Sequence, residues 1–180
     1  MSSQPTLQYI RDREFAYLLS STRLRAKQKT TRIDIGSVHL EPMNEGDAVD
    51  LPRWIAEVLV RQGVCESQEE SFASEVFKAV TREKIAGPEQ IPQLKQEFYL
   101  KIRRHLTFVP NSTSGNSEIE KTRTLIYDLI ALRLRKILSI ASSLSPPTDI
   151  KEKLTPEEYQ IFDSVYTLLQ SWRSMTMDGK

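Results

Sequence analysis

The chain has 180 residues, enough for one medium domain or for two small domains with separate cores. Hydrophobic residues make up 39% and charged residues 27%, which is typical of a globular protein and excludes a disordered one. The 25 Lys and Arg nearly balance the 24 Asp and Glu, and the net charge is +1. This balance excludes a whole-protein field that would attract nucleic acid or an anionic membrane.

Cysteine and histidine are too scarce for several kinds of site. The single cysteine, Cys65, excludes an internal disulfide framework and a multi-cysteine zinc site. Only two histidines occur, His39 and His105. No apolar run approaches the length that spans a bilayer, and residues 1–5 lack the charged-then-apolar layout of a signal peptide. We therefore expect an intracellular protein with no membrane partner.

The first third of the chain predicts one helix followed by short strands. Residues 6–20 mix apolar and charged positions at helical spacing, and residues 23–29 form a short basic stretch. Period-two alternation over residues 33–40, interrupted by Gly36, predicts two paired strands joined by a tight turn. With a third short strand at residues 48–51, this segment is predicted to be the only β-rich region.

The period of the apolar residues changes to helical near residue 50. Pro52 suits the first turn of a helix, and Gly63 predicts its end. The charged residues of this helix, Arg53 among them, are expected outside. The inward face is predicted to be Trp54, Ile55, Val58 and Leu59.

Everything after about residue 68 predicts helix, with residues 110–117 as a polar loop. A last helix begins at Thr155, with Pro156 in its first turn and Glu158 at the capping-box position. The predicted inward faces are Phe72, Ala73, Val76, Phe77 and Val80; then Ile91, Leu94, Phe98, Ile102, Leu106 and Val109; and finally Phe162, Val165, Tyr166, Leu169 and Trp172.

The helix predicted over residues 118–144 is apolar around most of its circumference, with one narrow polar seam. A helix of this kind is buried nearly all round. A helical domain of roughly 110 residues is too small to cover it alone, so we expect another subunit to cover part of it. Replacing Leu129 and Ile137 by Glu is then expected to dissociate an oligomer. The candidate interface residues, chosen from the helical wheel, are Leu125, Leu129, Leu132, Arg133, Ile137 and Ile140.

These elements predict a mainly α protein with a small β-rich N-terminal domain, that is, a helical bundle plus a small α+β domain. We place the small domain at residues 1–66 and the helical domain at residues 67–180.

Catalysis finds no support in the sequence. Cys65 with a histidine would suit a thiol nucleophile, but Cys65 lies in a short apolar element where cysteine behaves as a small hydrophobe. The carboxylate pairs at residues 69–70 and 157–158 lie at predicted helix starts, where they complement the helix dipole. Neither a glycine-rich phosphate loop nor metal-ligand spacing is present. We predict no enzyme activity, no cofactor and no metal.

Two basic clusters are candidates for contact with nucleic acid. They are residues 23–29 and the group Lys101, Arg103 and Arg104. Such clusters can give weak, salt-sensitive binding. No aromatic residue alternates with the cations, as stacking on single strands requires, and no helix-turn-helix or zinc-finger pattern occurs. Direct but weak DNA contact stays open as an alternative.

The segment over residues 45–59, Glu-Gly-Asp-Ala-Val-Asp-Leu-Pro-Arg-Trp-Ile-Ala-Glu-Val-Leu, resembles one branch of the GINS family. In that branch a glycine-bearing turn and a short strand lead into a Leu/Val-Pro-x-Trp-Leu-Ala-x-x-Leu helix. Residues 61–65, the arginine-rich helix at residues 132–137 and the helix start at residues 154–158 are similar as well. The residues that match the motif, all in structural roles, are Gly46, Leu51, Pro52, Trp54, Ala56 and Leu59.

The resemblance implies a non-catalytic DNA replication subunit. The small domain comes first, as in the second and third partner subunits of eukaryotes and in their archaeal counterpart, and the compact length points to the archaeal type. Implied partners are a sister GINS subunit in a hetero-tetramer, a replicative MCM-type helicase, which the complex stimulates, and a RecJ-like nuclease or Cdc-like factor. The implied location is the cytoplasm with the nucleoid in an archaeon, or the nucleus in a eukaryote.

The first 25 residues match no pattern of that family. Three alternatives to the GINS interpretation stay open: a nucleic-acid-binding protein that uses the basic N-terminal stretch, an enzyme that uses Cys65 or a cluster of glutamates, and a helical adaptor unrelated to replication.

Overall fold

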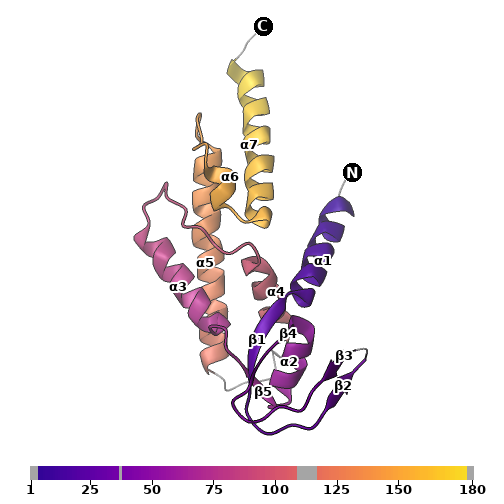
Figure 1. Ribbon diagram of the computed structural model, residues 1–180. Coiled ribbons are helices and arrows are strands. Elements are labelled where there is room, and N and C mark those ends of the chain that lie inside the picture. The colour runs from indigo at the N-terminus through magenta and orange to yellow at the C-terminus, as the bar shows by residue number, and fades with distance from the viewer. Residues whose placement is uncertain (1–3, 37, 109–116, 178–180) are drawn as a thin grey trace. The chain divides into compact units, whose positions relative to one another are not determined.

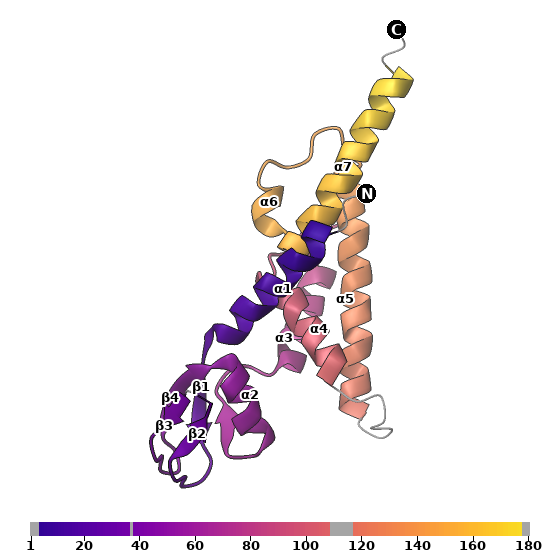
Figure 2. The same cartoon turned by 90° about the vertical axis from the view of Figure 1, so that its right-hand side faces the viewer.

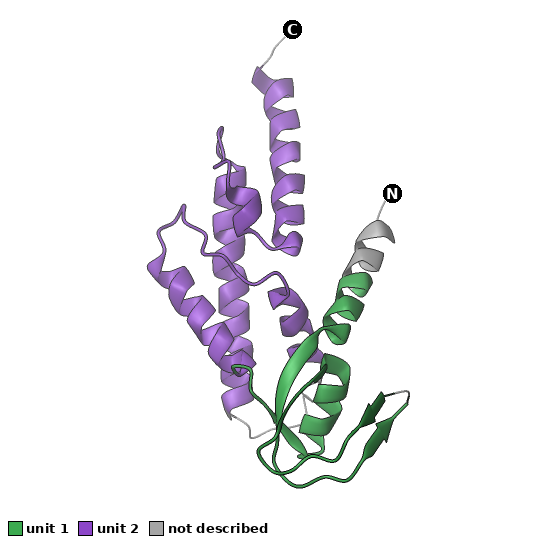
Figure 3. Ribbon diagram, viewed as in Figure 1, with its two compact units in different colours: residues 1–70 green, residues 71–180 purple. Residues whose placement is uncertain are grey.

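The computed structural model describes residues 4–36, 38–108 and 117–177. The chain divides into two compact units, residues 1–70 (unit 1) and residues 71–180 (unit 2), which Figure 3 shows in green and purple. The sequence placed this boundary after residue 66, which falls inside strand β5 (Cys65–Ser67). Because β5 pairs with β1 (Ser21–Ala26), the whole strand belongs to unit 1.

Unit 1 is built on a three-stranded antiparallel sheet in the order β4-β1-β5, with β4 at Ala48–Pro52. The central strand β1 lies where the sequence indicated only a basic stretch. The prediction that β structure is confined to residues 33–51 is therefore wrong. Along β1, exposed and buried residues alternate, and Leu24 is 1% exposed.

A separate two-stranded hairpin confirms the alternation predicted at residues 33–40. Its strands β2 (Ile33–Ile35) and β3 (Val38–Leu40) pair antiparallel, and they are labelled in Figure 1. Gly36 at the turn has φ +59°, a left-handed conformation that glycine adopts without strain. The inner side chains of the hairpin pack against the core of unit 1.

Two helices complete unit 1. Helix α1 (Gln4–Leu19) confirms the helix predicted near the N-terminus. Helix α2 (Arg53–Arg61) packs against the sheet through Ile55, Ala56 and Leu59. Val58 was expected on this face, but it is 37% exposed because the buried arc is centred on the other three residues. Gly63, with φ +73°, follows the helix end as predicted.

Unit 2 is helical. Figures 1 and 2 show the long helix α5 (Ser117–Ala141) beside α3 (Phe72–Ile85) and α7 (Pro156–Met177), with α4 (Phe98–Phe108) and the short α6 (Ile150–Lys153). One core cluster joins α3, α4 and α5, and a second joins α5, α6 and α7. The mainly helical structure with a small N-terminal sheet confirms the predicted fold class. None of the helices within the described ranges combines the length and apolarity that crossing a membrane would need.

The predicted inward faces of unit 2 are correct for most members but not for all. Phe77 is 60% exposed and Trp172 is 55% exposed. Ile91 and Leu94 are buried, but they belong to an irregular segment between α3 and α4 and not to a helix. Val109 and residues 110–116 of the predicted loop lie outside the described residues, and Ser117 begins α5.

Candidate subunit interface

Most of the interface residues chosen from the sequence lie inside unit 2 itself. Leu125 and Leu132 are half-buried. The others are buried among neighbouring elements of the same unit: Leu129, Arg133, Ile137 and Ile140. A helical wheel shows which positions are apolar, but not which of them the chain covers itself. A partner cannot reach these four side chains in this conformation, and Glu at Leu129 or Ile137 would put a charge into a core.

A different face of α5 carries exposed apolar residues. Tyr127 is 59% exposed, and Leu134 and Leu138 are each 38% exposed. Their spacing places all three on one side of the helix, between the buried arc and the polar seam. We call these three residues the α5 stripe.

Helix α7 has a longer stripe of the same kind. Phe162 faces the core, while Ile161 beside it is 43% exposed. Farther along the same face, Leu168 is 68%, Trp172 55% and Met175 76% exposed. We call Ile161, Leu168, Trp172 and Met175 the α7 stripe. Contiguous exposed apolar residues of this size mark contact sites with other molecules.

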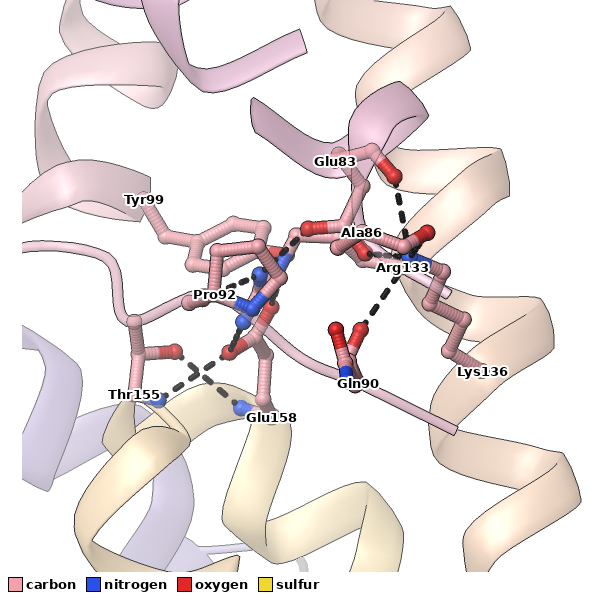
Figure 4. Close-up of polar contacts among 9 residues, drawn as sticks. All are labelled: Glu83, Ala86, Gln90, Pro92, Tyr99, Arg133, Lys136, Thr155 and Glu158. Carbon is pink, nitrogen blue, oxygen red and sulfur yellow. Dashed lines mark hydrogen bonds and ion pairs between the residues drawn. The ribbon is translucent and has the colours of Figure 1, made fainter. Parts of the chain in front are cut away.

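Behind these stripes, a buried network of charges fixes the helices of unit 2. Figure 4 shows Arg133 of α5 pointing toward Glu158 of α7 and Glu83 of α3. Its Nη2 donates to Glu158 Oε2 at 2.8 Å, its Nε donates to the other oxygen of the same carboxylate, and its Nη1 donates to Glu83 Oε2 at 2.9 Å. The side chain of Arg133 is 0% exposed. One guanidinium therefore ties three helices together.

Lys136 extends the network to the main chain. Its Nζ donates to the carbonyl oxygens of Glu83 at 2.9 Å, Ala86 at 3.2 Å and Gln90 at 3.1 Å. It also forms an ion pair with Glu83 Oε1 at 3.0 Å. Arg133 Nη1 donates to the carbonyl of Pro92 at 2.8 Å. Two cations of α5 thus hold the irregular segment that follows α3.

The network is formally neutral, with two cations and two carboxylates, which satisfies the usual requirement that buried charges are paired. Burial and the adjacent charge of Glu158 raise the pKa of Tyr99, whose hydroxyl donates to Glu158 Oε1 at 2.8 Å. Burial alone would lower the pKa of Arg133, but its bonds to Glu158 and the charge of Glu83 reverse this and raise it. Both groups therefore keep their protons, and the site is structural.

The predicted capping box at the start of α7 is confirmed. The backbone N–H of Thr155 donates to Glu158 Oε2 at 3.0 Å, and the N–H of Glu158 donates to Thr155 Oγ1 at 3.4 Å. The same carboxylate therefore caps the helix and binds Arg133. Sequence reasoning found its first role and missed its second, because no local pattern announces a partner 25 positions away.

The motif residues of unit 1 occupy structural positions. Gly46 has φ +90°, and its N–H donates to the carbonyl of Ala26 at 2.9 Å. Pro52 is the N-cap residue of α2. Leu51, Ala56 and Leu59 are buried, and Trp54 is half-buried against the same core.

Arg53 lies within this motif. The sequence had suggested that it is an outer residue, and the structure shows that it is not. Its Nη1 and Nη2 each donate to one oxygen of Glu69 at 2.8 Å, and its guanidinium lies 4.5 Å from the centre of the Tyr17 ring. The Oγ1 of Thr22 donates to the same carboxylate at 2.8 Å. The hydrogen bond to Glu69 raises the pKa of Arg53. Arg53 therefore connects α1, α2 and the end of unit 1.

The residues considered for catalysis do not form a reactive site. Cys65 is 2% exposed in β5, and burial raises the pKa of its thiol, whereas a nucleophilic thiol needs a lowered pKa. His39 pairs with Asp34, its Nδ1 2.5 Å from Oδ1, and His105 belongs to unit 2. Within the part of the chain that the structure describes, no three His, Cys, Asp or Glu residues lie close enough to hold a metal ion.

The basic clusters are partly offset by acidic neighbours. In the sheet register, Arg23 is opposite Asp50 and Arg25 is opposite Glu66. Directly opposite residues share one face of a sheet, so the arginines of β1 face carboxylates. In unit 2, Lys101 Nζ donates to Glu75 Oε2 at 2.8 Å. This arrangement does not favour the nucleic-acid alternative.

A helical bundle with exposed apolar stripes, joined to a small sheet-based unit, defines a class of protein that works by assembling with others. The family model of the GINS complex protein helical bundle domain, Sld5, matches residues 71–176, which lie within unit 2 and make up more than half of the chain. The chain therefore belongs to the GINS family and is a subunit of a GINS complex, a non-catalytic complex of DNA replication. Comparison with curated proteins gives no match.

Proposed function

We propose that this subunit is a scaffold that joins a sister GINS subunit in a hetero-tetramer and presents the assembly to a replicative MCM-type helicase and a RecJ-like nuclease or Cdc-like factor. The complex then stimulates the helicase at initiation and elongation. The protein acts at DNA, in the nucleoid of an archaeon or in the nucleus of a eukaryote, with at most weak direct contact to DNA.

The observation that carries this proposal is the pair of uncovered apolar stripes on a GINS helical bundle. Leu168 and Met175 are 68% and 76% exposed, although Phe162 of the same helix is buried. Large apolar side chains left in water forgo about 1.5–3 kcal/mol each relative to burial. A sister subunit that covers the stripes would recover this free energy, and helical bundles pack through such faces.

The test is the mass of the complex formed by the full chain and its co-expressed sister subunit, measured by light scattering. The double variants Leu134→Glu/Leu138→Glu and Leu168→Glu/Trp172→Glu should release the sister subunit while circular dichroism stays unchanged. The matched control is Leu144→Glu, because Leu144 is 79% exposed but belongs to neither stripe. A complex of unchanged mass in both double variants would place the interface elsewhere.

The helicase role has its own test. Unwinding by the MCM-type helicase should rise when the wild-type complex is added, and should rise further with the RecJ-like or Cdc-like factor. The double variants should lose this effect along with assembly. An assembled complex that leaves unwinding unchanged would refute the stimulation without touching the proposed subunit interface.

A further inference from the structure

Helix α3 separates its charges completely between its two faces. Its carboxylates, Glu75 and Glu83, are buried. Glu75 forms ion pairs with Lys101 at 2.8 Å and Lys95 at 3.3 Å, and Glu83 belongs to the network around Arg133. The charged residues on its outer face are cations: Lys78, Arg82 and Lys84.

Two large apolar side chains lie between these cations. Phe77 is 60% exposed and Ile85 is 80% exposed. On the helix they form one stripe with Thr81, flanked on one side by Lys84 and on the other by the remaining two cations. We call these six residues the α3 face.

Helix stability explains only part of the α3 face. Arg82 and Lys84 lie in the last turn, where positive charge complements the helix dipole. The helix dipole does not explain why Phe77 and Ile85, two turns apart, are exposed to solvent. An apolar stripe between like charges is instead the arrangement by which paired helices select an oppositely charged partner.

We propose that the α3 face is a docking surface for a helical segment of a partner protein, one that carries apolar residues flanked by Asp and Glu. Phe77 and Ile85 are separated by about 12 Å along the helix axis, at 1.5 Å per residue, so the partner presents two apolar side chains seven or eight positions apart. Its carboxylates meet Arg82 and Lys84. This surface is distinct from the α5 and α7 stripes and does not depend on the proposed helicase role.

Nucleic acid fits this surface less well. Phosphates would pair with the cations, and a base would stack on Phe77, but an exposed isoleucine offers neither charge nor an aromatic plane. The nearest carboxylate after the helix, Glu89, lies beyond Gly87 and Pro88. A protein helix uses both the apolar and the basic parts of the α3 face.

The probe is a fluorescein-labelled helical peptide of about 20 residues with two leucines seven positions apart and glutamates on both flanks. Its binding to the full chain is followed by fluorescence anisotropy. We expect saturable binding that weakens as salt is raised from about 0.05 to 0.3 M. Binding should weaken at least about tenfold in Phe77→Ser/Ile85→Ser and in Arg82→Glu/Lys84→Glu, a change of about 1.4 kcal/mol.

Two control variants match these changes on other surfaces of unit 2. Leu144→Ser removes an apolar side chain that is 79% exposed, and Lys121→Glu reverses an exposed charge on α5. Both should bind the peptide like the wild type, and circular dichroism should show every variant folded. The proposal is overturned if the peptide fails to bind the full chain. It is equally overturned if a scrambled peptide binds as well, or if single-stranded DNA binds through these residues more tightly than the peptide.

Discussion

Replacing Arg133 by methionine tests whether the buried network holds unit 2 together. Methionine replaces the aliphatic part of the arginine side chain and carries no charge, but it leaves the space of the guanidinium group unfilled. The substitution removes the bonds to Glu158, to Glu83 and to the carbonyl of Pro92. Lys136, which is paired with Glu83, then remains as the single cation of the network, Glu158 loses its ion pair, and the network carries a net charge of −1.

The expected loss is a large share of the stability of the unit. Removing one partner of a buried ion pair costs about 3–5 kcal/mol, because the other charge stays buried without compensation. A unit of roughly 110 residues has a free energy of unfolding of about 5–15 kcal/mol. We therefore expect Arg133→Met to lower the midpoint of thermal unfolding by more than about 10 °C.

The assays are thermal unfolding for the midpoint and urea unfolding for the free energy, both followed by far-ultraviolet circular dichroism, which reports mainly on the helices of unit 2. Trp54 provides a separate fluorescence signal for unit 1 in a Trp172→Phe background, and that signal should not change. The control is Arg135→Met on the exposed side of α5, expected to cost less than about 0.5 kcal/mol.

A third variant separates lost pairing from lost packing. Adding Glu158→Gln to Arg133→Met removes the uncompensated negative charge and leaves Lys136 paired with Glu83, so part of the lost stability should return. If Arg133→Met alone costs no more than Arg135→Met, the network does not stabilise unit 2 and the reasoning is refuted.

Three further predictions concern single residues. Gly46→Ala should cost about 1–2 kcal/mol in urea unfolding because Gly46 has φ +90°, whereas Gly87→Ala, which needs no left-handed backbone, should change stability by less than about 0.5 kcal/mol; equal effects would contradict the argument. Cys65 should react with a thiol reagent far more slowly in the folded chain than in urea, and its folded-state reaction should require more alkaline pH, because burial raises the pKa of its thiol; fast reaction at neutral pH would contradict this. Burial, and then the charge of Arg123, lower the pKa of His105, so protonation disfavours the folded state and unit 2 should lose stability as pH falls below about 6.5. His105→Gln should reduce that loss, and an identical pH dependence of the urea midpoint in both proteins would rule the effect out.

Local sequence patterns predicted those features whose causes are local. The capping box at residues 155–158, the end of α2 at Gly63 and the hairpin over residues 33–40 each depend on residues within a few positions of one another. Strand β1 has an equally local signal, since Thr22, Leu24 and Ala26 are buried and alternate with arginines. The strand was missed because its arginines were interpreted as part of a basic stretch. Charged residues commonly occupy the exposed face of a half-buried strand.

The candidate interface could not be predicted because burial depends on distant parts of the chain. Position 133 reads as a surface arginine on an apolar helix until Glu83 and Glu158 are brought to it from 50 and 25 positions away. Phe77 and Trp172 continue apolar patterns that the sequence assigned inward, yet none of the described elements of unit 2 covers them. Helical periodicity identifies an apolar face that favours contact. Only the folded structure shows whether that face packs against the same chain or is left for another molecule.

The manner in which α5 holds the segment after α3 has a consequence for how this family diverges. Lys136 and Arg133 bind main-chain carbonyls at Ala86, Gln90 and Pro92, which every amino acid supplies. Substitution at those three positions therefore leaves these hydrogen bonds intact, whereas replacing either Lys136 or Arg133 removes them. Across related chains we expect the two basic residues to be conserved while the residues whose carbonyls they bind vary. The loop would then keep the same backbone path although its sequence changes.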